Sequence, residues 1–360
     1  MNSVTPLRDA GFRLGGKAAT LGRLLRAGFP VPDGVVVSLV PGGRWQRPLA
    51  DAVVQLGGGT YAVRSSATGE DGRLASFAGQ YRTVLDVAAE QVEEQVRYVA
   101  STDAGHSGAY AAATAQPAPA GIAVIVQRML LPAAAGVAFT RHPVTGSPSA
   151  VVEAVAGLGE ALVSGNAAPQ RWQSDGGGRL TWSGPEEVLT AAQAGLIVRL
   201  ASQVEDLLGE GQDIEWAITG DHTPWILQAR PITAPAAGLP QVQPPARPSP
   251  GGTSVLAAGT PASPGTCRAR LRIIHGIADF SLFRPGEVLV CRATSPAWMP
   301  LLAQAAAVVT ATGGILSHAA IIARELRIPA VTEVAGATSL PAGALVTVDG
   351  GSGTIVREEP

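Results

Sequence analysis

Short apolar runs alternate with longer amphipathic stretches through the first 230 residues. The apolar runs are rich in Val and Ile and are bounded by polar residues, Gly or Pro, which is typical of buried strands. Stretches with helical periodicity lie near residues 17–28, 88–114 and 186–208. The predicted strands are DGVVVS, TYAVRSS, GIAVIVQRML, AGVAFT, AVVEAV, QDIEWAI and PWILQAR. This alternation indicates a mixed α/β (α+β) fold.

The C-terminal part of the chain repeats the alternation on a smaller scale. Its predicted helices are AWMPLLAQA and SHAAIIARELR. Its predicted strands are RARLRII, EVLVC, AAVVTA, PAVTEV and ALVTVDG. These elements predict a compact α/β sandwich or barrel of about a hundred residues.

A proline-rich segment separates the two patterns. Six prolines lie between Pro235 and Pro250, mixed with Ala, Gly, Gln and Ser and without apolar periodicity. This composition favours extended polyproline II, in which sixteen residues at ~3.1 Å each reach roughly 50 Å. We therefore expect two domains, residues 1–234 and 255–360, joined by a linker at 235–254.

Composition and charge narrow the classes of protein and partner. With 46% hydrophobic and 15% charged residues in 360, the chain can bury substantial cores. The N-terminus lacks a basic stretch followed by an apolar run, and no segment has the ~20 apolar residues that span a bilayer. The net charge of -2, with no basic run, argues against nucleic acid or a membrane surface as partner. We expect a cytoplasmic protein that binds small molecules or another protein.

Two cations stand where a phosphate group would be bound. Lys17 is the single lysine among 26 basic residues and follows two glycines at a predicted helix start, where amides and an ammonium can contact a phosphate or a base carbonyl. Chance survival under a bias toward arginine is the alternative. Arg64 leaves a strand into a loop of Ser, Gly and Thr that could cover a triphosphate. A surface turn with a structural arginine is the alternative there.

A predicted hairpin gathers oxygen ligands and an arginine. The period of two puts Asp213 and Glu215 on one strand face, and Gln228 and Arg230 on one face of the next strand. If residues 220–223 form the turn, the two polar faces coincide. Oxygen ligands suit Mg²⁺ and an arginine fork suits phosphate. The alternative is a solvated face with ordinary cross-strand ion pairs.

One histidine has the setting of a nucleophile. Gly313 and Gly314, followed by Ser317, precede His318 at a predicted helix start. A helix N-terminus disfavours protonated imidazole and attracts anions, so it favours a neutral nucleophile that then carries a phosphate. A structural histidine is the alternative. The other histidines lack such a setting: His106, His142, His222 and His275.

The N-terminal motifs together resemble the ATP-grasp domain of the pyruvate phosphate dikinase, phosphoenolpyruvate synthase and rifampin phosphotransferase superfamily. The motifs are GGKAATLG, RSSATGED with SFAGQ, VIVQRM, FTRHPVTG, GLGEALVSG, QDIEWAI and LQARPIT. The resemblance implies that ATP is bound by Lys17, Arg64, Gly79, Thr83 and Gln127. It also implies that Asp213, Glu215 and Gln228 hold the Mg²⁺ and, with Arg230, the phosphates.

The C-terminal motifs resemble the swivelling β/β/α phosphohistidine domain of the same superfamily. They are PASPG, TSPAWMP, TGGILSHAAIIARELRIPAV and VTVDGGSG. The resemblance implies that ATP is cleaved to AMP, that the β-phosphate passes to His318 with Arg230 as a catalytic residue, and that the γ-phosphate leaves to water or phosphate. The domain would then swing to an acceptor.

The chain departs from the family pattern in three ways. Only 46 residues separate Lys17 from Arg64, which predicts a trimmed N-terminal lobe. Leu316 stands where a phosphorylatable threonine is usual, and Arg327 where glycine is usual. No acceptor domain is recognised. Three hypotheses remain: a separate protein supplies the acceptor domain, the chain phosphorylates a small molecule directly, or it is a non-catalytic nucleotide-binding or phosphocarrier subunit.

Overall fold

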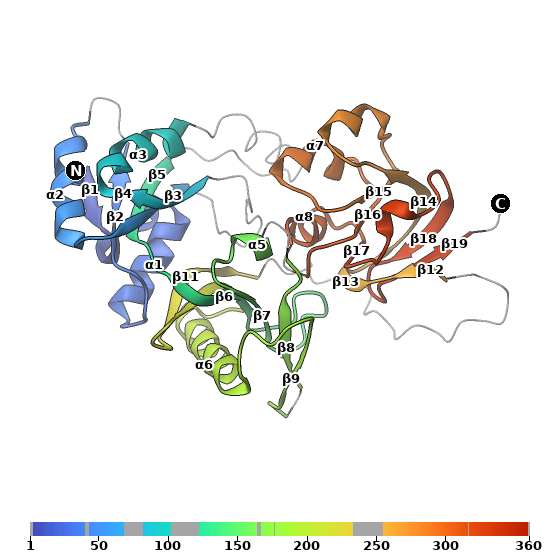
Figure 1. Cartoon of the computed structure of the whole chain (residues 1–360), viewed down its shortest axis with the longest axis horizontal. Coiled ribbons are helices and arrows are strands. Elements are labelled where there is room, and N and C mark those ends of the chain that lie inside the picture. The colour runs from blue at the N-terminus through green and yellow to red at the C-terminus, as the bar shows by residue number, and fades with distance from the viewer. Residues whose placement is uncertain are drawn as a thin grey trace.

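The computed structural model has the mixed α/β class that the sequence predicts, with three sheets (Figure 1). It describes residues 3–39, 43–67, 82–101, 122–163, 167–175, 177–232, 255–315 and 317–358. Two sheets lie within residues 4–231, here called the N-terminal part, and the third lies within residues 255–357, the C-terminal part. The predicted linker, Gly79 and Leu316 lie outside the described residues.

The first sheet is antiparallel, in the order β1-β2-β5-β3-β4. Its strands are β1 Val4–Pro6, β2 Gly34–Ser38, β3 Thr60–Ala67, β4 Thr83–Ala88 and β5 Ile122–Arg128. The helices around it are α1 Gly16–Arg26, α2 Gln46–Leu56 and α3 Val92–Ser101. Both faces of the sheet are covered, because Val36 packs into one core while Val35 and Val37 pack into another. The continuous apolar run of this strand follows from that double burial.

The second sheet is also antiparallel, in the order β11-β10-β6-β7-β8-β9. Its strands are β6 Pro132–Phe139, β7 Val151–Ala156, β8 Gln170–Ser174, β9 Leu180–Ser183, β10 Gln212–Thr219 and β11 Pro224–Pro231. The short helix α5, Glu160–Val163, follows β7. Helix α6, Ala191–Leu208, covers one face, where Ile197 shares a core with Ile214 and Trp216. The opposite face of β10 is left for polar side chains.

Helix α6 begins and ends where its sequence signals predict. Thr190 accepts a hydrogen bond from the Gln193 amide, and the Gln193 side chain accepts one from the Thr190 amide, which completes a capping box. Gly209 ends the helix in the left-handed conformation. These caps fix the helix that supports the back of the second sheet.

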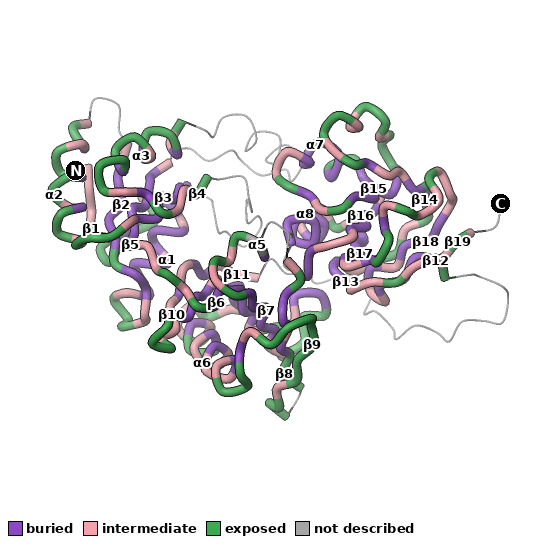
Figure 2. The backbone as a smooth tube through the Cα atoms, viewed as in Figure 1, coloured by how far each residue is buried: buried purple, intermediate pink, exposed green. Residues whose placement is uncertain are grey.

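The third sheet has eight strands in the order β12-β19-β18-β14-β15-β16-β17-β13. They are β12 Val255–Ala258, β13 Thr260–Ser263, β14 Thr266–Ile273, β15 Val288–Cys291, β16 Ala307–Thr310, β17 Ala330–Thr332, β18 Leu345–Asp349 and β19 Thr354–Arg357. The helices are α7 Met299–Leu302 and α8 His318–Leu326. Strands β14 to β17 are parallel neighbours. Helix α8 packs on this sheet and is buried along most of its length (Figure 2).

Short 3₁₀ helices complete the described elements: Leu7–Asp9, Phe12–Leu14, Ala89–Gln91, Ile277–Leu282, Pro296–Trp298 and Ala337–Ser339. Where a helix was expected over residues 88–114, the structure has a 3₁₀ turn and then α3, which runs to Ser101; residues 102–121 are outside the described part. No described helix is both long and apolar enough to span a membrane.

Candidate functional site

The predicted hairpin is present, and its polar residues face one another. Asp213 pairs with Arg230 and Glu215 with Gln228, and the chain turns between Thr219 and Pro224. The register shifts after Glu215, so a bulge interrupts the ladder between the two strands. The sequence did not predict this bulge. Beside it, the backbone carbonyl of Leu227 in β11 accepts a hydrogen bond from a residue of another strand.

That donor is Arg64 of β3, which joins the two sheets of the N-terminal part. Its Nη1 donates to the Leu227 carbonyl at 2.7 Å, and its Nη2 donates to Glu215 Oε2 and Gln228 Oε1, both at 2.9 Å. Arg64 is buried. The sequence placed Arg64 and the hairpin in one site through resemblance alone, and the structure brings their side chains into direct contact.

Lys17 lies in the same region, at the start of α1. Its Nζ donates to the Ser65 carbonyl at 3.4 Å. The loop before it is anchored on β3: Ser66 Oγ donates to the Leu14 carbonyl and accepts from the Ala18 amide. Gly15 has φ +93°, and a Cβ there would lie 2.2 Å from Ser66 Oγ, so only glycine allows this approach. The double glycine therefore serves to seat the helix start against Arg64's strand.

Charges of both signs converge on the hairpin. Burial alone would raise the pKa of Glu215, but the charges of Arg64, Arg230 and Lys17 lower it below its usual value. Burial raises the pKa of Asp213, and the charge and hydrogen bond of Arg230 offset only part of that effect. Three cations face two carboxylates. An anion can therefore be accommodated here without leaving an excess of negative charge.

The remaining predicted nucleotide ligands are less directly placed. Gln127 is buried, and its Nε2 donates to the Pro32 carbonyl at 2.7 Å. Thr83 is exposed and pairs with Arg64 across β3 and β4, so both side chains lie on one sheet face. Gly79 lies outside the described residues. Roles for these three in binding ATP stay predictions.

His318 is the first residue of α8. Ser317 caps the helix by accepting from the Ala320 amide. The His318 Nδ1 lies 2.9 Å from Thr294 Oγ1, whereas its Nε2 is buried and has no hydrogen-bond partner among the described residues. Burial lowers the pKa of His318 to about 4. The imidazole is therefore neutral near pH 7. The main physical cause is burial, whereas the sequence analysis expected the helix N-terminus to disfavour the protonated ring.

Thr294 is a candidate site residue that sequence reasoning missed. It stands in the segment TSPAWMP, 24 positions before His318, and only the fold brings the two together. A threonine hydroxyl on Nδ1 fixes the ring and leaves Nε2 as the nitrogen available for reaction. The segment TSPAWMP is recognisable as a motif, but nothing in its spacing indicates that Thr294 contacts His318.

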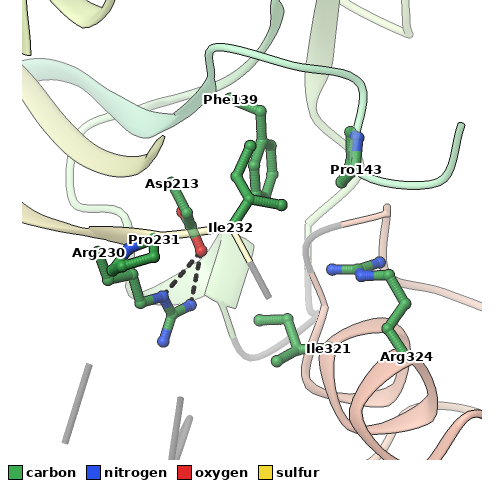
Figure 3. A pocket seen from close by; sticks show the side chains of 8 residues that line it. All are labelled: Phe139, Pro143, Asp213, Arg230, Pro231, Ile232, Ile321 and Arg324. Carbon is green, nitrogen blue, oxygen red and sulfur yellow. Dashed lines mark hydrogen bonds and ion pairs between the residues drawn. The ribbon is translucent and has the colours of Figure 1, made fainter. Parts of the chain in front are cut away.

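Helix α8 reaches the hairpin across a small cavity between the two parts of the chain (Figure 3). Ile321 and Arg324 line it from α8, and Asp213 and Arg230 line it from the hairpin. Arg230 Nε and Nη2 both donate to Asp213 Oδ2 at 2.8 Å. The other lining residues are Phe139, Pro143, Pro231 and Ile232. The helix that begins with His318 is thus docked beside the predicted phosphate-binding residues.

Arg324 adds a buried cation to this boundary. Its Nη1 donates to the carbonyls of Ala262 and Ile315, at 2.9 and 2.8 Å. Burial lowers the pKa of Arg324 to about 10, and the charge of Asp213 acts in the opposite direction. The guanidinium therefore keeps its charge at neutral pH.

The donor set at the hairpin suits Mg²⁺ in its chemistry. Asp213, Glu215 and Gln228 offer two carboxylates and an amide oxygen, all hard ligands. These oxygens accept hydrogen bonds from Arg64 and Arg230. Within the described ranges no cluster of three or more His, Cys, Asp or Glu side chains has metal-binding geometry. A metal here therefore relies on the amide oxygen or on oxygens of a bound phosphate.

Comparison with known families gives two matches. Residues 47–180 and 179–245 match the pyruvate phosphate dikinase AMP/ATP-binding domain. Residues 283–353 match the mobile domain of PEP-utilising enzymes. The first match covers more than half of the chain and includes Arg64 and the hairpin, and the second includes Thr294 and His318.

Curated relatives are similar to much of this chain and are themselves longer. A probable phosphoenolpyruvate synthase of Archaeoglobus fulgidus is 32% identical over 96% of this chain and 57% of its own. The phosphoenolpyruvate synthase of Aeropyrum pernix is 32% identical over 95% of this chain and 56% of its own. The prodigiosin synthesizing transferase PigC of Serratia marcescens is 35% identical over 62% of this chain and 32% of its own. The chain spans about half the length of the first two.

Proposed function

Because the chain belongs to the pyruvate phosphate dikinase and phosphoenolpyruvate synthase superfamily, we propose that it is an ATP-dependent phosphotransferase of the dikinase type. Its fold class is an ATP-grasp domain followed by a phosphohistidine domain, as the sequence predicted. In the proposed reaction the chain cleaves ATP to AMP and phosphate and keeps the β-phosphoryl group on His318.

One observation carries the proposal: α8, which begins with His318, lies against the hairpin that holds Asp213 and Arg230 (Figure 3). Phosphoryl transfer demands that acceptor and phosphate-binding cations share one water-poor site. A purely structural role for His318 would leave its buried Nε2 unexplained, because this atom has no hydrogen-bond partner among the described residues.

The His318 ring supplies the nucleophile. Thr294 engages Nδ1; when Nδ1 carries the proton and donates it to the Thr294 hydroxyl, Nε2 holds the lone pair. Nε2 forms a bond to the β-phosphorus as the oxygen bridge between the α- and β-phosphates breaks and AMP leaves. Water or phosphate then takes the γ-phosphoryl group as the β–γ bridge breaks.

The cations of the N-terminal part bind the phosphates and balance their charge. Arg64 and Arg230 now pair with Glu215 and Asp213, so their guanidiniums are already oriented at the site. Lys17 adds a third positive charge from the start of α1. Asp213, Glu215 and Gln228 would hold Mg²⁺, which when bound supplies positive charge between phosphate oxygens.

The acceptor of the phosphoryl group is the open part of this proposal. The named relatives include phosphoenolpyruvate synthases and a prodigiosin synthesizing transferase, so a pyruvate-like acid or another small molecule fits the family. The acceptor is bound either directly by this protein or by a separate acceptor-domain protein. A cytoplasmic location is part of this proposal. A non-catalytic nucleotide-binding or phosphocarrier subunit is the alternative function.

Identification of the nucleotide product tests the proposal. Purified chain incubated with Mg²⁺ and ATP should release AMP, one for each His318 modified, and His318→Ala should release none above background. His275→Ala is the matched control, because His275 is exposed in the same part of the chain. ADP as the sole product would replace the dikinase assignment with an ordinary kinase. If neither the parent chain nor His275→Ala cleaves ATP, the non-catalytic alternative is favoured.

A further inference from the structure

An ion-pair network joins the two parts of the chain away from the hairpin. Arg171 of β8 donates from Nε to Glu153 Oε1 of β7 at 2.8 Å. Its Nη2 also lies 3.3 Å from Glu333 Oε2 and 3.4 Å from Oε1, and Glu333 belongs to the C-terminal part. The second family match includes Glu333, but the proposed chemistry uses none of these three residues. They form a contact that needs its own explanation.

Glu333 holds an unusual backbone conformation to make this contact. Its φ is +56°, in the left-handed region that favours glycine. Such a conformation is unfavourable for a non-glycine residue and is kept where the surroundings require it. The side chain accepts a hydrogen bond from Thr260 Oγ1 and reaches Arg171. The strain is thus associated with a carboxylate directed at the other part of the chain.

The loop before His318 lies on the same surface. A Cβ on Gly314 would lie 2.6 Å from Glu153 Oε1 and 3.0 Å from Arg171 Nη2. Glu153 is fully buried and held by Arg171, so it cannot easily move aside. Ile315 is buried in an apolar cluster with Val137 and other residues of β6 and β7. Glycine is therefore required at 314 for the loop to reach this depth.

The network shares a sheet face with the hairpin. Glu215 pairs with Val137, Val137 with Glu153, and Glu153 with Arg171, so the four form one row across β10, β6, β7 and β8. Directly opposite residues lie on the same face, and neighbouring strands are about 4.8 Å apart. Glu153 is thus about 10 Å from Glu215 along the row. A loop seated on Glu153 and Val137 must leave α8 beside the hairpin.

We propose that Arg171, Glu153 and Glu333, with Ile315 as the apolar contact, form a docking site that holds the C-terminal part where His318 is loaded. Arg171 and Glu333 are positioning residues for that step, and the occupant is the chain's own C-terminal part, through Gly314, Ile315 and Glu333. This proposal rests on the proposed function, because loading here means phosphorylation of His318 by ATP.

The charges suit a contact that forms and breaks repeatedly. When the C-terminal part leaves, Arg171 keeps Glu153 as its partner, so neither buried charge is stranded. Burial raises the pKa of Glu153, and the charge and hydrogen bond of Arg171 offset part of that effect. The charged form of Glu153 is therefore stabilised by its contact with Arg171, which does not require Glu333. Glu333, 29% exposed in its side chain, returns to water. The partly exposed ion pair between Glu333 and Arg171 is of a kind that shifts an equilibrium about fivefold, here the one between the docked and the released C-terminal part.

Two variants at position 333 test the proposal. Glu333→Gln keeps the shape and removes the charge, and Glu333→Gly also relieves the left-handed strain. Both should lower the rate of His318 phosphorylation at saturating ATP about fivefold, with ATP affinity unchanged. Loading in the parent chain should slow as salt is raised, while Glu333→Gln should respond little. Glu287→Gln is the control, because Glu287 pairs with Arg272 within the C-terminal part.

Gly314→Ala is a second, independent test, because its added methyl meets Glu153 only in the docked position. It should slow loading more than Glu333→Gln does. Small-angle X-ray scattering without nucleotide supplies a readout that does not need turnover: each variant should be more extended than the parent chain and the control.

The outcomes separate the two proposals. Slower loading together with a more extended chain supports the docking site. Unchanged scattering, or changed scattering with unchanged loading, overturns it. If the parent chain is never phosphorylated, the proposed function fails; the docking site then fails as a loading position too, even where scattering shows that the contact forms.

Discussion

Thr294 contacts Nδ1 of His318, and in the proposed reaction this contact determines which ring nitrogen reacts. The hydroxyl lies 2.9 Å from Nδ1, and the buried Nε2 has no partner in the part of the chain that the structure describes. A buried polar atom without a partner costs stability and is rare in folded proteins. Here the unpaired atom is the one that the proposed reaction uses, so the cost has a functional reason.

Thr294→Val should separate loading from ATP binding. The substitution keeps the shape but leaves Nδ1 without its partner, so the ring orientation and tautomer are no longer held. We expect the rate of His318 phosphorylation to fall about tenfold or more, with ATP affinity unchanged. Thr310→Val is the control, because the Thr310 hydroxyl is buried in the same part without a partner. Equal loading rates in the two variants would remove Thr294 from the site.

The protonation of His318 gives a prediction at the same scale. Its pKa is lowered to about 4 in the fold, below the 6.5 of an ordinary histidine. As pH falls from 6.5 toward 4, the unfolded chain takes up a proton at this residue and the folded chain does not. The residue therefore lowers the free energy of unfolding over that window and has no effect above it.

Nuclear magnetic resonance measures this directly. The His318 ring proton, assigned by its loss in His318→Ala, should not titrate between pH 8 and about 5, whereas exposed His275 serves as an internal reference for an accessible ring. A His318 midpoint near 6.5 would contradict the buried, neutral nucleophile.

At the scale of elements, the hairpin was the part of the site that the sequence predicted most completely. The period of two put Asp213 and Glu215 on one strand face and Gln228 and Arg230 on one face of the next strand. The structure brings these faces together and shows the individual pairs, Asp213 with Arg230 and Glu215 with Gln228. The bulge after Glu215 has no signal in the local pattern, and in the fold the Leu227 carbonyl beside it accepts a hydrogen bond from Arg64 of another sheet. Local pattern thus predicted the strands but not their irregularity.

Elements that depend on partners distant in sequence were missed. Helix α2 was not expected, because Pro48 and a mixed pattern obscure its periodicity. Glu153 appeared in the sequence only as a polar residue inside an apolar strand. Its partner Arg171 is 18 positions away, and Glu333 comes from the other part of the chain. No periodicity connects residues whose contact depends on how two sheets and a loop meet.

Gly136 of β6 gives a prediction on the second sheet. A Cβ there would lie 1.8 Å from the Glu153 carbonyl and 2.8 Å from Trp216 Cζ2. Trp216 is fully buried, so Gly136→Ala must displace either the neighbouring strand or the indole. We expect a loss of about 3 kcal/mol in the free energy of unfolding. Gly220→Ala, at a turn with open space around it, should change little in the same denaturant titration. Equal stability of both variants would contradict the packing described for β6.

At the scale of the whole molecule, the two parts have separate cores. The buried apolar clusters of the two parts share few residues. Among the described residues, Ile315 is the one from the C-terminal part that packs into a cluster of the N-terminal part. The sequence predicts two domains from the change of pattern on either side of the proline-rich segment, and their limits stay a prediction. It did not indicate how the parts dock.

Calorimetry should therefore show two unfolding transitions. A non-hydrolysable ATP analogue with Mg²⁺ should raise only the transition of the N-terminal part. At a concentration of 100 Kd the expected stabilisation is about 2.7 kcal/mol. Arg64→Ala should abolish the shift, because Arg64 holds Glu215 and Gln228 in place. A single transition, or equal shifts of both, would contradict two independently folded parts.

The central claim is that the β-phosphoryl group of ATP comes to rest on His318, and positional labelling tests it most directly. The chain is incubated with Mg²⁺ and ATP labelled at the β- or at the γ-phosphate, and the peptide containing His318 is isolated under alkaline conditions. The account predicts acid-labile label on that peptide from β-labelled ATP, with γ-label recovered in solution. Persistent γ-label on the protein after turnover, or β-label that remains in His318→Ala, would contradict it.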